Sequence, residues 1–241
     1  MKKFLVPSFY INNYIRDFDA VARAHGLKGR RLSKGSLLTI PGTINNTAHY
    51  VCSGIVHLSL SHSSGNTKSL FFYGPKTIFP LGVVPHENPI DYELVLQAFT
   101  DIEVISFSYP VLRQLCVENG ELAAQILEQN CDSVGYLYYQ QMNHAYSPTL
   151  IRVCDILYIY LASFQPRDGV IGLSQRELAD LVGCSRPQLE RILGALRSEG
   201  ILSTGRGRLT VPQVSRLAEK CSDSLRETFS GAGPFEPIPF P

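Results

Sequence analysis

One segment near the C-terminal end of the chain constrains its fold most, because it encodes two short helices joined by a tight turn. Ser174, followed three residues later by Glu177, is a capping box that begins the first helix. Gly183 supplies the turn, and Ser185 with Gln188 forms a second capping box at the start of the next helix. Two helices joined in this way make a helix-turn-helix.

A β-hairpin, or wing, is predicted directly after the second helix. Its strands are residues 201–203 and 208–211, and residues 204–207 form the turn. The whole segment of residues 174–217, which contains both helices and the wing, is basic. Its arginines are Arg176, Arg186, Arg191, Arg197, Arg206, Arg208 and Arg216, and its acids are Glu177, Asp180, Glu190 and Glu199. On a chain whose formal net charge is only +1, such a segment indicates contact with the phosphates of a nucleic acid.

The second helix carries side chains that suit the major groove of DNA. If Leu189, Ile192 and Leu193 pack inward, charged and amide groups lie on the outer face of its first two turns. Arginine can donate two hydrogen bonds to guanine, glutamine can pair with adenine, and glutamate can accept from cytosine. Hydroxyls and arginines near the helix N-termini and in the wing suit phosphate contacts. The predicted DNA-binding residues are Ser174, Arg176, Ser185, Arg186, Gln188, Glu190, Arg191, Arg206 and Arg208.

The N-terminal half reads as a sheet domain. Between about residues 30 and 108, short runs of strand-forming residues alternate with turns, a pattern typical of an antiparallel roll or barrel. The expected strands include residues 37–40, 49–52, 55–60, 70–73, 92–99 and 102–107. We therefore expect an α+β chain: an antiparallel β-roll at residues 1–109, a helical region at 110–146, a winged helix-turn-helix at 147–220 and a flexible, Pro- and Gly-rich tail at 221–241.

A long helix is predicted from Glu121 to about His144, where apolar residues recur at helical spacing. Such a helix is roughly 36 Å long, so its apolar stripe extends beyond a small roll. Pairing with a second copy would cover the stripe and produce a homodimer. The alternative is packing entirely against its own roll. After an interruption at residues 146–149, residues 149–163 are again helical, with apolar side chains mostly on one side.

The chain resembles the CRP/FNR family of transcription regulators. The closest agreement lies in residues 177–186, which read ELADLVGCSR, and in Arg191-Ile192-Leu193. Residues 32–38 (LSKGSLL) and 51–56 (VCSGIV) resemble the family's β-roll. The resemblance implies a sensory roll of the cyclic-nucleotide-binding type, a dimerisation helix and a palindromic DNA site. It also implies RNA polymerase as a partner, and Arg191 matches the family's base-reading arginine. A cytoplasmic location is expected for a separate reason: no apolar run is long enough for a membrane span, and the N-terminal residues lack a signal peptide's apolar core.

Two departures from the family pattern matter. Pro187 stands where members that read the common half-site carry glutamate, so a standard half-site is not expected. Tyr92-Glu93 stands where the family's cyclic-nucleotide binders carry an Arg-Ser or Arg-Thr pair for the phosphate, and their Gly-Glu pair for the ribose falls near Phe79-Pro80. A carboxylate repels a phosphate, so we do not expect cyclic AMP to bind. Residues 70–74 (LFFYG) and 146–152 (YSPTLIR) are similar to the halophenol-sensing regulators of that family.

The effector is therefore expected to be a small, largely uncharged aromatic molecule. No lysine or arginine occurs between Arg113 and Arg152, and aromatic walls with neutral hydrogen-bonding groups suit such a ligand. The predicted effector-binding residues are Phe71, Phe72, Tyr73, Phe79, Tyr92, Tyr136, Tyr138 and Tyr139. The alternative is that these aromatic side chains fill the core and bind no ligand.

No metal, cofactor or membrane partner is expected. The six cysteines lie far apart without a CxxC pair, which favours free thiols. Two other functions remain as alternatives: a cupin-like β-roll metalloenzyme, and a sensory module that regulates a partner protein without binding DNA. The chain lacks the compact histidine and glutamate set with which a cupin binds its metal. The arginines of the second helix and wing argue against a sensory module that does not bind DNA. We expect a DNA-binding regulator, not an enzyme.

Overall fold

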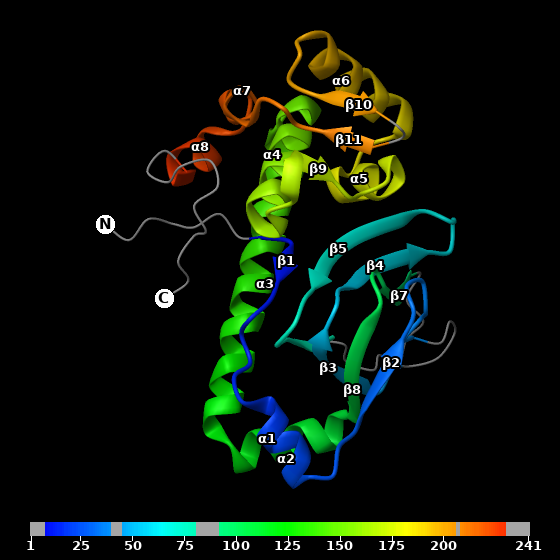
Figure 1. Ribbon diagram of the computed structural model, residues 1–241, viewed down its shortest axis with the longest axis vertical. Helices are drawn as coiled ribbons and strands as arrows, with labels where there is room; N and C mark the ends of the chain where they lie inside the picture. The colour runs from blue at the N-terminus through cyan, green and yellow to red at the C-terminus, as the bar shows by residue number, and fades with distance from the viewer. Residues whose placement is uncertain (1–7, 40–44, 81–91, 206–207, 230–241) are drawn as a thin grey trace. The chain divides into compact units, whose positions relative to one another are not determined.

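The computed structural model describes residues 8–39, 45–80, 92–205 and 208–229, and Figure 1 shows their path. The chain divides into two compact units, and the boundary falls inside its long helix α3 (Gly120–Tyr146). The N-terminal unit spans Phe9–Val134. The C-terminal unit contains Ser8 and the residues from Gly135 onward. Each unit is described here by itself.

The N-terminal unit is a β-roll of two sheets. One has the strand order β1-β5-β4-β7 and the other β2-β8-β3-β6. Their bounds are β1 (Tyr10–Ile11), β2 (Gly29–Leu32), β3 (Thr47–Ser53), β4 (Val56–His62), β5 (Thr67–Tyr73), β6 (Ile78–Phe79), β7 (Tyr92–Ala98) and β8 (Ile102–Ser108). All pairings are antiparallel except β1 with β5. The predicted antiparallel roll is confirmed.

One predicted strand is wrong where the structure describes it. Residues 37–39 form only an isolated bridge, between Leu37 and Gln97, and residue 40 lies outside the described residues. The backbone N–H of Leu38 donates to the carbonyl of Leu96 at 2.8 Å. The segment therefore forms a few backbone hydrogen bonds with β7 instead of a full strand ladder. Its apolar sequence does not distinguish these two arrangements.

Two helices close one end of the roll around a common core. They are α1 (Phe18–Ala24) and α2 (Tyr109–Glu118), drawn side by side in Figure 1. The Phe18 ring lies 5.6 Å from that of Phe107 and 4.4 Å from that of Tyr50. Burying aromatic side chains of this size against the sheet is the main stabilising contribution of such a core.

The long helix α3 confirms the helix predicted from residue 121 to about 144. Within the N-terminal unit, Gln129 fastens it to the roll by two hydrogen bonds. Its Nε2 donates to the carbonyl oxygen of Ile78 at 2.6 Å, and its Oε1 accepts from the N–H of Ile78 at 3.1 Å. Among the described residues no further strand pairs with the outer edge of β6, and the Gln129 side chain forms hydrogen bonds with that edge instead.

The C-terminal unit is a winged helix-turn-helix built around α4 (Thr149–Phe164). The other helices are α5 (Gln175–Val182), α6 (Arg186–Ser198), α7 (Val214–Glu219) and α8 (Asp223–Phe229); a 3-10 turn, η1 (Arg167–Gly169), precedes the sheet. The sheet has the order β10-β11-β9, with β9 (Val170–Ile171), β10 (Ser203–Gly205) and β11 (Arg208–Thr210). The predicted wing is present as β10 and β11, but its first strand begins at Ser203 and includes residues 204–205, which were predicted as turn, whereas residues 201–202 are not in a strand. The strand β9 was not predicted.

Two expectations for this unit need correction. The apolar residues of α4 were expected mostly on one side, but every residue from Val153 to Leu161 is buried, since α5, α6, α7 and β9 all contact this helix. The flexible tail predicted for residues 221–241 is wrong for its first part. Residues 223–229 form α8, and Cys221 and Leu225 are buried. Residues 230–241 lie outside the described residues.

Candidate nucleic-acid interface

The first helix of the helix-turn-helix begins with a complete capping box. The Ser174 hydroxyl accepts from the backbone N–H of Glu177 at 3.2 Å, and the Glu177 carboxylate accepts from the N–H of Ser174 at 2.7 Å. The helix ends at Gly183, whose φ of 68° is the left-handed conformation that glycine adopts without strain. The predicted first capping box and the glycine turn are therefore both present.

The predicted second capping box is only half present. The Ser185 hydroxyl accepts from the N–H of Gln188 at 3.4 Å, but the Gln188 side chain does not return the bond. Instead, its Nε2 donates to the hydroxyl oxygen of Thr149, the first residue of α4, at 2.9 Å. A partner 39 residues away in the sequence has replaced the local one.

The second helix, α6, buries one face and exposes the other. Leu189, Leu193 and Leu196 are buried in the C-terminal unit. Ile192 is half-buried, and Arg186, Pro187, Glu190 and Arg191 are exposed on the first two turns. Gln188 is half-buried between these two faces. The structure therefore brings Arg186, Glu190 and Arg191 together as a free, polar surface, and it places Gln188 at the margin of that surface.

The predicted phosphate-binding residues also lie at the surface. Ser174, Arg176 and Ser185 are exposed at the N-terminal ends of α5 and α6, and Arg208 is exposed at the start of β11. Arg206 lies outside the described residues. Two further arginines of the basic segment are engaged within the fold: Arg197 donates to the Thr204 hydroxyl at 3.2 Å, and Arg216 donates to the carbonyl of Glu199 at 2.9 Å.

The aromatic residues predicted to bind an effector do not form one cluster. Within the roll, Tyr73 stacks on Phe79 at 4.9 Å and lies 5.8 Å from Phe71. Phe72 packs elsewhere, against Phe9, His57 and Phe99. All four predicted residues of this set are buried, and burial raises the pKa of the Tyr73 hydroxyl. Tyr92 is exposed at the start of β7.

The tyrosines of α3 belong to the C-terminal unit. Tyr136 is buried, Tyr139 is half-buried, and Tyr138 is 70% exposed. Tyr136 and Tyr139 line a cavity of about 20 Å³, together with Gln140 and Arg152. That volume holds a single water molecule and no organic ligand.

A buried histidine in the roll was missed by the sequence analysis. His49 is 1% exposed, its Nδ1 is hydrogen-bonded to the Ser106 hydroxyl at 2.8 Å, and its ring lies 5.6 Å from that of Phe79. In the described part of the chain its Nε2 has no hydrogen-bond partner. Burial, with a smaller contribution from Arg30, lowers the pKa of His49 to about 4. The imidazole is therefore neutral at pH 7.

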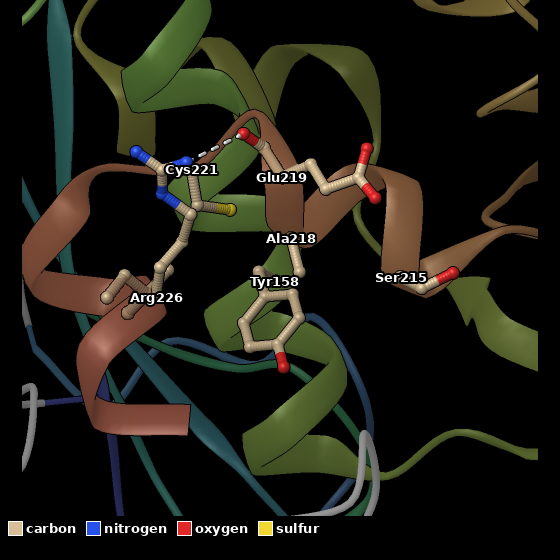
Figure 2. A pocket seen from close by; sticks show the side chains of 7 residues that line it. Tyr158, Ser215, Ala218, Glu219, Cys221 and Arg226 are labelled. Carbon is tan, nitrogen blue, oxygen red and sulfur yellow. Dashed lines mark hydrogen bonds between the residues drawn. The ribbon is translucent and has the colours of Figure 1, made fainter. Parts of the chain in front are cut away.

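A larger cavity of about 210 Å³ lies in the C-terminal unit between α4, α7 and α8 (Figure 2). It is lined by Tyr158, Ser215, Ala218, Glu219, Cys221, Leu225 and Arg226. The Arg226 guanidinium donates to the carbonyl of Glu219 at 3.5 Å. None of the residues predicted to bind an effector lines this cavity.

The helices in the described part of the chain include no candidate for a membrane span, because none combines the required length with sufficient hydrophobicity.

Comparisons with known proteins match both the C-terminal unit and the chain as a whole. The family described as the Crp-like helix-turn-helix domain matches residues 151–220. The Global nitrogen regulator of Synechococcus elongatus is 21% identical over 201 residues, covering 81% of this chain and 90% of that protein. The Cyclic AMP receptor protein of Thermus thermophilus is 24% identical over 198 residues, covering 79% of this chain and 87% of that protein. Among solved structures, OCPA-complexed CprK shares the fold with a TM-score of 0.66 at 18% identity, covering 89% of this chain and 99% of that chain.

Proposed function

Because this chain is a DNA-binding transcription regulator of the CRP/FNR family, and not an enzyme, we propose that it binds a palindromic operator as a homodimer. We further propose that a small molecule other than cyclic AMP switches it, and that RNA polymerase is its partner at promoters. The observation that carries the DNA-binding mode is the exposed surface of Arg186, Glu190 and Arg191 on the first two turns of α6. Such a helix reads base edges with these turns, while exposed Arg176 and Arg208 can hold the flanking phosphates.

The dimer is supported by an apolar stripe along α3. Leu127, Cys131 and Tyr138 are exposed, and Val134 is half-buried between them. These residues follow the alternating spacing of four and three positions that two paired helices require. Leu127 is 62% exposed and Met142 is 61% exposed. A second copy of α3 would remove this surface from water in a two-fold arrangement.

The operator follows from the two-fold symmetry of such a dimer. Two reading helices related by a two-fold axis recognise inverted half-sites about one helical turn apart, roughly 10 bp from centre to centre. Selection of duplexes from random DNA tests this expectation, and sedimentation measures the stoichiometry of the complex. Selected sites without inverted symmetry, or one chain per site, would contradict the proposal.

The exclusion of cyclic AMP rests on Glu93 and its neighbour. The two residues begin β7 and are both exposed. They offer a phenol and a carboxylate at the position where the family's cyclic-nucleotide binders carry a cation, so the phosphate would meet a like charge instead of an opposite one. The name of the Thermus thermophilus relative refers to cyclic AMP, so calorimetry with cyclic AMP and cyclic GMP is the direct test. Micromolar binding of either nucleotide would refute this part of the proposal.

The chemistry of the roll interior supports an uncharged, aromatic effector. The row of Phe71, Tyr73 and Phe79 ends at His49, a neutral imidazole whose Nε2 lacks a partner among the described residues. A neutral imidazole can exchange a hydrogen bond with a hydroxyl or carbonyl but does not attract an anion as a cation would. A thermal-shift screen of phenols against matched di- and tri-anionic metabolites tests the class, and hits confined to the anions would contradict it.

A further inference from the structure

A chain of hydrogen bonds joins the end of the long helix α3 to the first turn of the reading helix α6. The Arg152 Nη1 donates to Nδ1 of His144 at 2.9 Å and to its carbonyl oxygen at 3.4 Å. The Arg152 Nη2 donates to the Thr149 hydroxyl oxygen at 3.3 Å. Gln188 Nε2 donates to that same oxygen at 2.9 Å. All four residues lie in the C-terminal unit.

We propose that Thr149 and Arg152 are positioning residues for DNA recognition, and that Gln188 serves as the anchor they hold rather than as a reader of adenine. This inference concerns how the DNA-binding surface is oriented and rests on the mode of binding proposed above. A glutamine that reads adenine uses both its amide nitrogen and its amide oxygen. Here the nitrogen already has a partner inside the protein, and the side chain is half-buried.

The position of Gln188 in α6 makes the anchor effective. It is the third residue of the helix, between exposed Arg186 and exposed Arg191. A bond from this turn to the first residue of α4 restrains the tilt and rotation of the part of α6 that carries both arginines. Because bidentate contacts to base edges depend on position within a fraction of an ångström, loss of that restraint lowers discrimination more than it lowers attraction to phosphates.

Arg152 makes the anchor part of a larger support. Its planar guanidinium bridges two elements, since one nitrogen contacts His144 at the end of α3 and another contacts Thr149 at the start of α4. A fork of this shape holds two acceptors in fixed geometry, which a lysine cannot do. Movement of the end of α3 is thereby transmitted to the oxygen that holds Gln188.

The test compares full-length variants on duplexes selected by the wild-type chain, with a random-sequence duplex as the non-specific reference. Thr149→Val removes the acceptor at nearly constant volume, Thr149→Ser restores it, and Gln188→Leu removes the donor. Arg152→Lys keeps the charge and removes the fork. Ser198→Ala, which loses a hydroxyl at the opposite end of α6, is the matched control.

We expect Thr149→Val and Gln188→Leu each to lower affinity for the selected duplex about threefold to tenfold, with non-specific affinity unchanged. Thr149→Ser and Ser198→Ala should bind the selected duplex as tightly as the wild type. The double variant Thr149→Val/Gln188→Leu should bind it no less tightly than the single variant of lower affinity, because both substitutions remove the same hydrogen bond. Arg152→Lys provides the same readout if Thr149→Val proves unstable.

Three results would overturn the inference. Thr149→Val could retain wild-type selectivity, the two single effects could multiply in the double variant, or Gln188→Leu could lose preference at one base pair that Thr149→Val preserves. Measuring on duplexes that carry a single half-site keeps these ratios readable even if the protein proves not to be a dimer. Failure of the dimeric operator would then be a separate result.

Discussion

The hydroxyl of Tyr139 donates a hydrogen bond of 2.9 Å to the carboxylate of Asp155, and that carboxylate is only 1% exposed. Its second oxygen accepts from the backbone N–H of Ser222 at 2.8 Å. A buried acid on α4 thus ties the end of α3 to the connection between α7 and α8. Burial and the neighbouring Asp155 both raise the pKa of Tyr139, so its hydroxyl remains a donor throughout the physiological range.

Replacing Asp155 should therefore destabilise the protein strongly. Asp155→Ala removes the buried acceptor of both the Tyr139 hydroxyl and the Ser222 N–H, so we expect a loss of about 3 kcal/mol in the free energy of unfolding. Tyr139→Phe removes only one donor and should cost about 1 kcal/mol. Urea denaturation measures both. Equal losses for the two variants would show that the Ser222 contact contributes nothing.

The two caps of the helix-turn-helix should differ in strength. Ser174→Ala breaks a reciprocated capping box and should lower the free energy of unfolding by about 1 kcal/mol. Ser185→Ala breaks a single bond of 3.4 Å that Gln188 does not return, and we expect a smaller loss. Thermal melting of the two variants, with buffer and concentration matched, compares them. The opposite order would contradict the unequal caps seen here.

Arg191 and Arg208 should affect DNA binding in different ways. In the proposed docking of α6, the exposed Arg191 guanidinium would read a base edge, so Arg191→Ala should cost about 1–3 kcal/mol and relax preference at one base pair of each proposed half-site. In the same proposal the wing would contact phosphate through exposed Arg208, so Arg208→Ala should weaken all sequences alike and reduce the salt slope by about one counter-ion. Affinity measured over a series of salt concentrations separates the two. A variant Arg191→Ala with unchanged selectivity would exclude this docking of α6.

His49 should make stability depend on pH. Its pKa is about 4 in the folded chain and about 6.5 when unfolded. Between these values the unfolded state binds the extra proton, so stability is fully present above about pH 6.5 and falls as the pH drops toward 4. The full contribution is about 3 kcal/mol. Urea denaturation from pH 4 to 7 should show a steeper loss for the wild type than for His49→Gln. Parallel curves would mean that His49 titrates normally.

Much of the C-terminal fold is encoded locally. The pair Ser174 and Glu177 requires only a spacing of three residues, and Gly183 requires only freedom to adopt a positive φ, so both were recognisable without tertiary contacts. The same reasoning identified Arg186 and Arg191 as exposed, because the leucines between them define which face of α6 is buried. The long helix α3 was predictable for the same reason, since its apolar period extends over many turns.

The incorrect predictions concern residues that contact a partner distant in the sequence instead of a neighbouring one. Ser185 and Gln188 have the spacing of a capping box, but the Thr149 hydroxyl lies within reach of the Gln188 amide once α4 and α6 pack together. Residues 223–229 read as part of a flexible tail because Pro and Gly follow them, yet the burial of Leu225 makes them a helix.

By itself, then, the sequence determined the helix-turn-helix and the long helix, because capping residues and helical periodicity act over a few residues. It also indicated the roll and the wing from short strand-forming runs and turns, but not the exact bounds of every strand. Tertiary structure alone decided where side chains with several suitable partners form their bonds. Gln188 could cap its own helix, read a base or bond to Thr149, and these choices differ in energy by little more than one hydrogen bond. His49 gives no signal in the sequence for the same reason: its burial and its lowered pKa arise from strands that meet it only after folding.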